Sequence, residues 1–262
     1  MPYLSSLSLT PHRQSPYPYD IPAIRWAQNI DLSQKVTFFI GENGSGKSTL
    51  LETLAFRLQL PHMDGSGYDK RAFHAARKLV GHVQLEWDIE RSIGFFFRAE
   101  DFGDYLNSVD RTNASLHSQL DYLQGDVPDE VIEQMKESAN YQVHHVRKNY
   151  GQDLDSFSHG EAYLHIMNEK INRNGIYLLD EPEASLSPAR QISLIYFINE
   201  HLKKYNSQFI IATHSPMLIA FPGSVIYEIT ANGMNPTELE DTEHYSVTKN
   251  FINNPEIYLR HL

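Results

Sequence analysis

The feature that most constrains this fold is a glycine-rich loop between a strand-like run and a helix-like run. Residues 41–49 read G-E-N-G-S-G-K-S-T and match the pattern G-x-x-x-x-G-K-[ST] in full. Residues 35–40 form a short β-rich apolar run, and residues 49–60 carry apolar side chains at helical spacing. Backbone N–H groups of such a loop wrap a phosphate, since glycines permit positive φ and close approach. The sequence therefore predicts a strand, a phosphate-binding loop and a helix.

The residues of this loop have separate expected roles. We expect Lys47 to reach the β- and γ-phosphates of a nucleotide, and the Ser48 hydroxyl to bind Mg²⁺. The helix that starts near Ser48 points its positive end at the anion. A chance glycine-rich turn is the alternative, which the strand and helix on either side disfavour. The other residues expected to hold the phosphates are Gly41, Glu42, Asn43, Gly44, Ser45, Gly46 and Thr49.

Two consecutive carboxylates follow a second apolar run at residues 176–179. Ligands of α/β proteins bind at the carboxyl ends of the strands, where Asp180 and Glu181 fall. We expect Asp180 to hold Mg²⁺ and its water. Glu181 is expected to polarise the attacking water, as a base or as an orienting group. A solvated acidic turn is the alternative, and the motif gains weight from the phosphate-binding loop that precedes it.

The alternation of apolar runs predicts an α/β fold. Runs 176–179 and 209–212 are typical of parallel strands buried on both faces, and residues 188–204 between them have helical spacing. We expect one domain over 1–262, with a helical subdomain of roughly 101–160 inserted in it. Further expectations are extended or turn structure at 11–22, a surface loop at 61–78, and strands at 78–88, 91–98 and 225–229.

Composition narrows the classes of function. The absence of cysteine excludes a disulfide scaffold, a thiol nucleophile and any cysteine-ligated zinc or iron–sulfur site. A net charge of −11 disfavours a surface that coats nucleic acid, although a local basic patch remains open. No run approaches the ~18–20 apolar residues of a membrane span, and the N-terminus lacks the pattern of a secretory signal. We therefore expect a cytoplasmic protein with no transmembrane segment of its own.

Three further motifs resemble those of ABC-type ATPases. Residues 180–188 (D-E-P-E-A-S-L-S-P) resemble their Walker B motif and D-loop, 157–161 (F-S-H-G-E) their signature motif, and 213–215 (T-H-S) their switch histidine. The order along the chain is that of the superfamily, and the resemblance spans about 20–230. Within it, the chain looks most like predicted bacterial stand-alone ATPases, often labelled AAA family but ABC-type by motif. F-F-F-R-A-E at 95–100 and E-D-T-E-H-Y at 240–245 also match that family's habits.

The resemblance implies a P-loop NTPase fold with an ABC-type mixed β-sheet core and ATP as the nucleotide. It implies that Ser158, Gly160 and Glu161 cap the γ-phosphate of a second subunit, so that ATP promotes a homodimer. His159 and Glu161 depart from the transporter pattern, and the S-x-G-E core is more like RecF-like and chromosome-maintenance ATPases. An ordinary capping box at Ser158 is compatible with this role. His214 would hydrogen-bond the γ-phosphate, and a buried structural histidine is the alternative.

Two positions of the family pattern stay open. ABC proteins place a glutamine after a strand, and here the position falls near Glu100, which fits either a metal or water ligand or a surface salt bridge. The ring that stacks on adenine would be Tyr17 or Tyr19, with aromatic packing among prolines as the alternative.

The preferred function is an ATPase that hydrolyses ATP with Mg²⁺ at a dimer interface and drives a conformational change in a partner. The alternatives are the nucleotide-binding subunit of a membrane transporter, and a DNA repair or defence ATPase acting with a nuclease or toxin. The S-x-G-E core and the missing glutamine weigh against the transporter. The short segment 101–160 leaves no room for a long coiled coil. The partner, nucleic acid or protein, is not identified by the sequence.

Overall fold

The central element is a six-stranded mixed sheet. The computed structural model describes residues 3–10, 16–62, 73–89, 93–103 and 159–260, together with isolated positions between 105 and 133. Five neighbouring strands of the sheet are parallel, and the edge strand β9 is antiparallel to β8. In spatial order the strands are β5 (Gly94–Arg98), β6 (Gly175–Asp180), β7 (Ser207–Ala212), β3 (Val36–Gly41), β8 (Val225–Thr230) and β9 (Gly233–Thr237). The predicted α/β class is confirmed.

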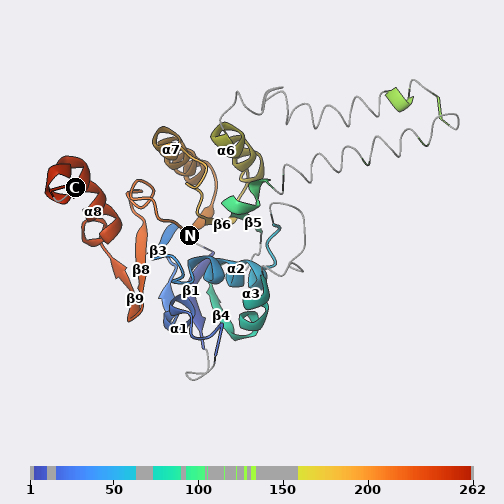
Figure 1. The fold of residues 1–262 in the computed structure, drawn as a ribbon. Helices are drawn as coiled ribbons and strands as arrows, with labels where there is room; N and C mark the ends of the chain where they lie inside the picture. Colours follow the sequence, from blue (N-terminus) through green and yellow to red (C-terminus); the bar gives the residue numbers. More distant parts are fainter. Residues whose placement is uncertain are drawn as a thin grey trace.

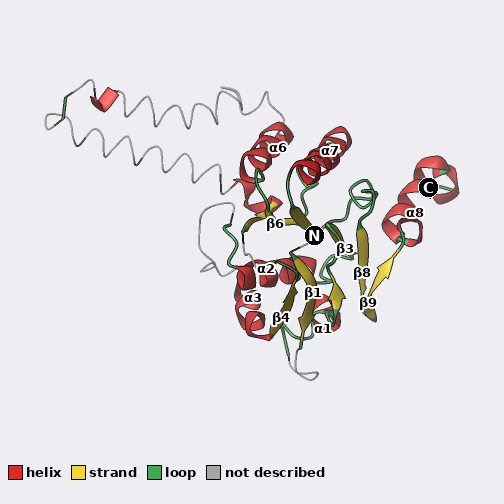
Figure 2. Cartoon of the chain, turned by 180° about the vertical axis from the view of Figure 1, so that it is seen from behind, coloured by secondary structure: helices red, strands yellow, loops and turns green. Residues whose placement is uncertain are grey.

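The two faces of this sheet are covered differently (Figures 1 and 2). One face packs on the helices α1 (Pro22–Trp26), α2 (Lys47–Leu58) and α3 (His74–Leu79), with a small antiparallel sheet beyond them. That sheet has the order β2 (Ile30–Asp31), β1 (Leu4–Leu9), β4 (Val83–Trp87). The opposite face packs on α6 (His159–Lys170) and α7 (Pro188–Lys204). The last helices, α8 (Glu243–Asn253) and α9 (Pro255–Tyr258), follow the edge strand β9.

The period of two along a strand explains why the sheet separates two cores. In β3 the side chain of Phe39 belongs to the core with α2, whereas Phe38 and Ile40 belong to the core with α7. In β7, Ile210 and Phe209 alternate in the same way. Because both faces are apolar, the strands read as continuous apolar runs in the sequence.

A buried glutamine joins the two sheets. The Gln208 side chain in β7 accepts hydrogen bonds from the backbone N–H groups of Tyr3 and Leu4 at 3.1 and 2.9 Å. Its amide nitrogen donates to the carbonyl oxygens of Leu4 and Leu32 at 3.0 and 2.5 Å. The buried amide is therefore satisfied, and the strand β1 is held next to the central sheet.

Several predicted boundaries were wrong. A strand was expected at 78–88, but only its second half, from Val83, is one. The first half completes α3, whose Ala76 and Leu79 pack on the core as one helix face, and then forms a 3₁₀ turn (η2, Val80–His82). The loop expected at 61–78 becomes helical from His74. Pro22 opens α1 instead of continuing extended structure, a position that suits proline.

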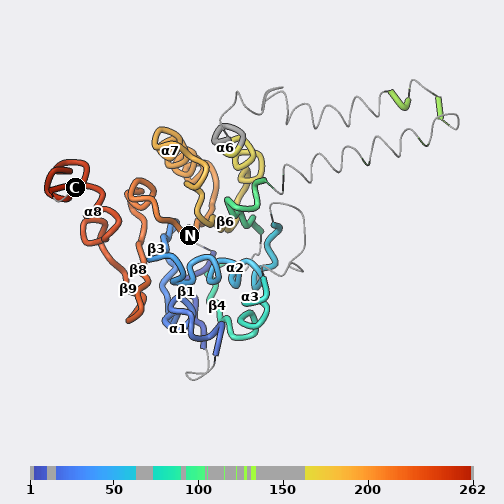
Figure 3. Tube along the Cα trace, in the orientation of Figure 1, coloured from blue at the N-terminus to red at the C-terminus, as the bar shows by residue number. Residues whose placement is uncertain are grey.

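The remaining predicted elements lie where the sequence placed them, with small shifts. Figure 3 follows the chain from β3 through the glycine-rich loop into α2. Most of the predicted helical subdomain at 101–160 lies outside the described residues, so the subdomain is still a prediction from the sequence. Within the part of the chain that is described, no helix has both the length and the apolar character needed to cross a membrane.

Candidate active site

The glycine-rich loop joins β3 to α2 with a backbone that requires glycine at two points. Gly46 is the N-cap of α2 at φ 95°, and a Cβ there would overlap the Ile21 side chain. Gly44 has φ 82°. Both angles fall in the left-handed region, which glycine adopts at little cost. The loop is also held from the side, since Ala23 N–H donates to the Ser45 carbonyl oxygen at 2.8 Å.

Lys47 is folded into this loop. Its side chain is buried, and Nζ donates to the carbonyl oxygens of Gly41 at 2.8 Å and Glu42 at 3.1 Å. Burial lowers the pKa of the Lys47 ammonium, and the nearby carboxylates of Glu181 and Asp180 oppose that shift. The lysine is thus placed where the predicted phosphates would lie.

A pocket of about 290 Å³ opens above the loop. It is lined by Glu181, by Tyr17, whose side chain is exposed, and by the loop residues Asn43, Gly44, Gly46, Lys47, Ser48 and Thr49. Tyr19 instead donates its hydroxyl to the Lys78 carbonyl oxygen at 3.2 Å. Of the two tyrosines considered for adenine, Tyr17 therefore borders the site and Tyr19 packs away from it.

Ser48 and Asp180 come together across the sheet. The Ser48 hydroxyl donates to Asp180 Oδ1 at 3.2 Å, although 132 residues separate the two in sequence. Burial raises the pKa of Asp180 to about 7, and the hydrogen bond from Ser48 opposes the rise. A hydroxyl beside a buried carboxylate is an oxygen donor set suited to Mg²⁺, and a cation there would relieve the desolvation of the carboxylate. These two residues therefore fit the expected metal.

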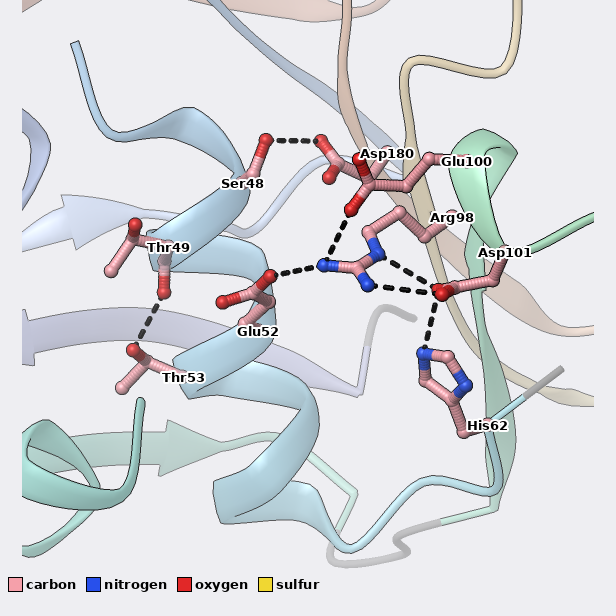
Figure 4. A network of polar contacts seen from close by, with 9 residues as sticks. All are labelled: Ser48, Thr49, Glu52, Thr53, His62, Arg98, Glu100, Asp101 and Asp180. Atoms are coloured by element: carbon pink, nitrogen blue, oxygen red, sulfur yellow. Dashed lines mark hydrogen bonds and ion pairs between the residues drawn. The ribbon is translucent and has the colours of Figure 1, made fainter. Parts of the chain in front are cut away.

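Glu100, the third residue considered as a metal ligand, is paired with an arginine. It lies in the 3₁₀ turn η3 (Ala99–Asp101), its side chain is 70% exposed, and Oε1 lies 2.8 Å from an Arg98 nitrogen (Figure 4). Its charge adds to the effect of burial on the pKa of Asp180, so the two carboxylates are near each other. The salt bridge to Arg98 is one of the two roles that the sequence left open for Glu100. The other role, as a ligand of the metal or of water, stays a prediction.

Glu181 turns the chain away from Asp180. Its φ of 48° is unusual for a residue with a side chain, and its N–H donates to the Ala212 carbonyl oxygen at 2.9 Å. The Glu181 carboxylate is 44% exposed, and Oε1 lies 3.6 Å from His214 Nε2. Asp180 ends β6, Glu181 follows it, and His214 comes just after β7, so the parallel pairing of β6 and β7 brings the three to one sheet edge.

Two residues near His214 were not predicted. Glu183, half-buried in the turn after Glu181, accepts the His214 backbone N–H at 2.6 Å, and desolvation raises its pKa. The sequence signal that could have pointed to Glu183 is its place in the D-E-P-E sequence, next to the predicted catalytic carboxylates. His244 of α8 lies with Nε2 3.3 Å from His214 Nδ1. The sequence analysis noted the E-D-T-E-H-Y segment that contains His244, but assigned this histidine no role.

A network of ion pairs around the buried Arg98 was also not predicted from the sequence (Figure 4). Arg98, at the end of β5, donates to Glu52 Oε1 of α2 at 2.6 Å and to both Asp101 oxygens at 2.8 and 3.0 Å. Burial raises the pKa of Glu52 to about 7 in spite of Arg98. Burial also favours a higher pKa for Asp101, but hydrogen bonds from His62 and Arg98 outweigh it and bring that pKa to about 2. The network ties the phosphate-loop helix to the end of β5.

The signature motif is only partly within the described chain. Ser158 lies outside it, and Gly160 and Glu161 lie in the first turn of α6, which begins at His159. The helix α6 packs on the sheet face opposite to that of α2. The motif therefore belongs to a different layer of the molecule from the phosphate-binding loop.

Comparisons with known proteins agree with this architecture. The family described as "ABC transporter" matches residues 29–184, and the family described as "AAA ATPase domain" matches 154–219. The first match covers more than half of the chain, so the chain belongs to the ABC family and carries an ABC-type ATPase domain with a P-loop. No protein of curated function matches the sequence.

Solved structures resemble this chain at low sequence identity. The head domain of an Smc protein bound to the C-winged helix domain of ScpA superimposes with a TM-score of 0.50, at 14% identity over 90% of this chain and 98% of that one. A second Smc head, from Pyrococcus furiosus, scores 0.48 at 14% identity, over 97% and 99% of the two chains. The protein cbiO1 of Clostridium perfringens, part of the ABC transporter complex cbiONQ, scores 0.46 at 17% identity, over 100% of each chain. At such identities the first likeness shows the fold alone.

Proposed function

We propose that this chain binds and hydrolyses ATP with Mg²⁺ between two copies of itself, and that the cycle drives a conformational change in another macromolecule. The observation that carries the proposal is the convergence of Lys47, the Ser48–Asp180 pair and the Glu181–His214 pair at one edge of the central sheet. A charge-neutralising lysine, an oxygen donor set and a carboxylate beside a histidine are the groups that phosphoryl transfer to water uses.

In the proposed reaction the loop N–H groups and Lys47 hold the β- and γ-phosphates. Ser48 and Asp180 hold Mg²⁺, which supplies positive charge to the phosphate oxygens when bound. Glu181 orients a water molecule and accepts its proton as the water oxygen bonds to the γ-phosphorus. The bond from the γ-phosphorus to the β–γ bridging oxygen breaks, and ADP leaves. His214 hydrogen-bonds the γ-phosphate.

The position of the signature motif supports the proposed dimer. The first turn of α6, with Gly160 and Glu161, lies in the layer opposite to the phosphate-binding loop. We propose that the motif, with Ser158, caps the γ-phosphate bound by the second copy. ATP then stabilises the pair, and hydrolysis removes that stabilisation. The partner and the cytoplasmic location stay predictions from the sequence.

Phosphate release from ATP·Mg²⁺ by the purified chain tests this function. Wild type should turn over, Lys47→Ala should lose binding and turnover, and Lys203→Ala, an exposed lysine of α7, should behave as wild type. Equal nucleotide affinity in wild type and Lys47→Ala would contradict the assignment. Adding DNA to the same assay tests whether nucleic acid is the partner, since a true partner should change the rate.

A further inference from the structure

The C-terminal helix α8 places a second histidine against the predicted switch histidine. His244 Nε2 lies 3.3 Å from His214 Nδ1, and the ring centroids are 5.5 Å apart. The helix start is fixed nearby, because the buried Thr242 caps it and accepts the Tyr245 N–H at 3.3 Å. A pocket of about 350 Å³ lies here, bordered by Asn43 of the phosphate-binding loop and by both histidines.

The surroundings of both histidines favour the neutral form of the ring. Burial lowers the pKa of His214 and of His244, and the Lys47 ammonium lowers each further. Glu181 opposes this at His214, and Glu228 and Glu243 oppose it at His244, without reversing it. The start of α8 also disfavours a positive charge on its first turn. Two neutral imidazoles that share a hydrogen bond need one N–H donor and one lone pair.

The carboxylate on the other side of His214 favours one direction for that bond. Glu181 Oε1 lies 3.6 Å from His214 Nε2, and a carboxylate is an acceptor only. A lone pair on Nε2 would face that negative charge, so the proton belongs on Nε2. The Nδ1 atom of His214 then carries the lone pair, and His244 Nε2–H must be the donor to it. Among the described residues, His244 Nδ1 has no hydrogen-bond partner that would demand the opposite tautomer.

We propose that His244 is a positioning residue whose Nε2–H group, together with the Glu181 carboxylate, stabilises His214 in its Nε2–H tautomer. In that form His214 presents an N–H toward Glu181 and toward any phosphate oxygen in the pocket. The inference rests on the proposed function, because the tautomer matters to the reaction only if a phosphate binds there. It makes α8 a part of the active site and gives the E-D-T-E-H-Y segment a physical role.

Nitrogen-15 NMR of histidine-labelled protein without nucleotide tests the tautomer directly. The His214 signals are identified by their loss in His214→Gln. Wild type should show His214 protonated at Nε2, and His244→Phe, which keeps a ring but removes the donor, should show averaged signals from both tautomers. Tyr245→Phe, one residue along the same helix, should match wild type. An Nδ1–H tautomer in wild type, or an unchanged Nε2–H tautomer in His244→Phe, overturns the inference.

Steady-state kinetics separate positioning from a merely structural role. We expect His244→Phe to lower kcat about tenfold, the scale of one lost orienting hydrogen bond, and to leave the KM for ATP within about twofold. His244→Gln, whose amide can donate near the Nε2 position, should recover most of the rate. A variant His244→Phe with wild-type kcat, or a His244→Gln as slow as it, contradicts the inference. If wild type hydrolyses no ATP, the proposed function fails while the NMR result still stands on its own.

Discussion

At the scale of single residues, two neighbouring carboxylates are given different environments by one backbone angle. Asp180 ends β6 with 2% of its surface exposed and meets the Ser48 hydroxyl. Glu181 follows at φ 48° and points its half-exposed carboxylate at His214. Unusual backbone angles of this kind concentrate at functional sites because they aim side chains. In the proposed function, the D-E pair would therefore supply one group to the metal and one to the attacking water.

Replacing Glu181 by Gln should remove the group that polarises water and leave the loop intact. We expect turnover to fall by about 10²–10⁴-fold, the usual effect of a positioned acid–base group, with ATP affinity nearly unchanged. Single-turnover phosphate release and calorimetric titration measure the two quantities. Glu200→Gln, an exposed carboxylate on α7, is the matched control. Wild-type turnover in Glu181→Gln would show that another group activates the water.

A second prediction concerns stability and pH. Burial lowers the pKa of His201 from 6.5 to about 4, so the unfolded chain binds the proton more readily than the folded chain. The contribution of His201 to the free energy of unfolding is therefore fully present above pH 6.5 and is lost as the pH falls toward 4. We expect His201→Phe to reduce the drop in unfolding free energy between pH 7.5 and pH 5 by about 2 kcal/mol.

Urea denaturation at the two pH values measures this difference. An unchanged drop in His201→Phe would mean that His201 takes up its proton in the folded state.

At the scale of secondary-structure elements, Arg98 joins the end of β5 to the phosphate-loop helix α2. Its guanidinium bonds Glu52 and Asp101, both buried, while its third partner, Glu100, is exposed. Removing one member of a buried ion network leaves the others unpaired at high cost. The strength of the network therefore lies in its buried members.

We expect Arg98→Leu to destabilise the chain by about 3–5 kcal/mol, because the buried Glu52 and Asp101 would both lose the guanidinium, although Asp101 would keep His62. Glu100→Gln, which touches the same arginine from the exposed side, should cost less than about 0.5 kcal/mol. Thermal or urea unfolding of both variants measures this. Equal effects of the two substitutions would contradict the assigned division between buried and exposed partners.

The elements that the sequence predicted are those whose signals are local. The strand β6 and the helix α7 could be found because a fully buried strand is a continuous apolar run and Pro188 suits a helix start. The strand β1 was missed, since L-S-S-L-S-L has a bulge that breaks its alternation and it pairs with β4 some 80 residues away. The contacts of His244 and Arg98 were missed because, like the pairing of β1 with β4, they join segments that are far apart in the sequence.

At the scale of the whole molecule, the central sheet separates the two parts that the proposed reaction needs together. The phosphate-binding loop starts α2 on one face, and α6, which opens with the signature motif, covers the other (Figure 1). A complete site would then require two chains arranged head to tail. Nucleotide would stabilise that pair, and a variant that binds but does not hydrolyse ATP would accumulate it.

Light scattering of Glu181→Gln with ATP·Mg²⁺ tests this central claim most directly. We expect the measured mass to double from that of one 30.1 kDa chain when ATP is added, and Ser158→Arg to prevent the doubling while the monomer still binds ATP. The bulk and charge of arginine at the contact are the reason for the second expectation. A Glu181→Gln protein that stays at the mass of one chain across micromolar concentrations with saturating ATP would contradict the nucleotide-sandwich homodimer.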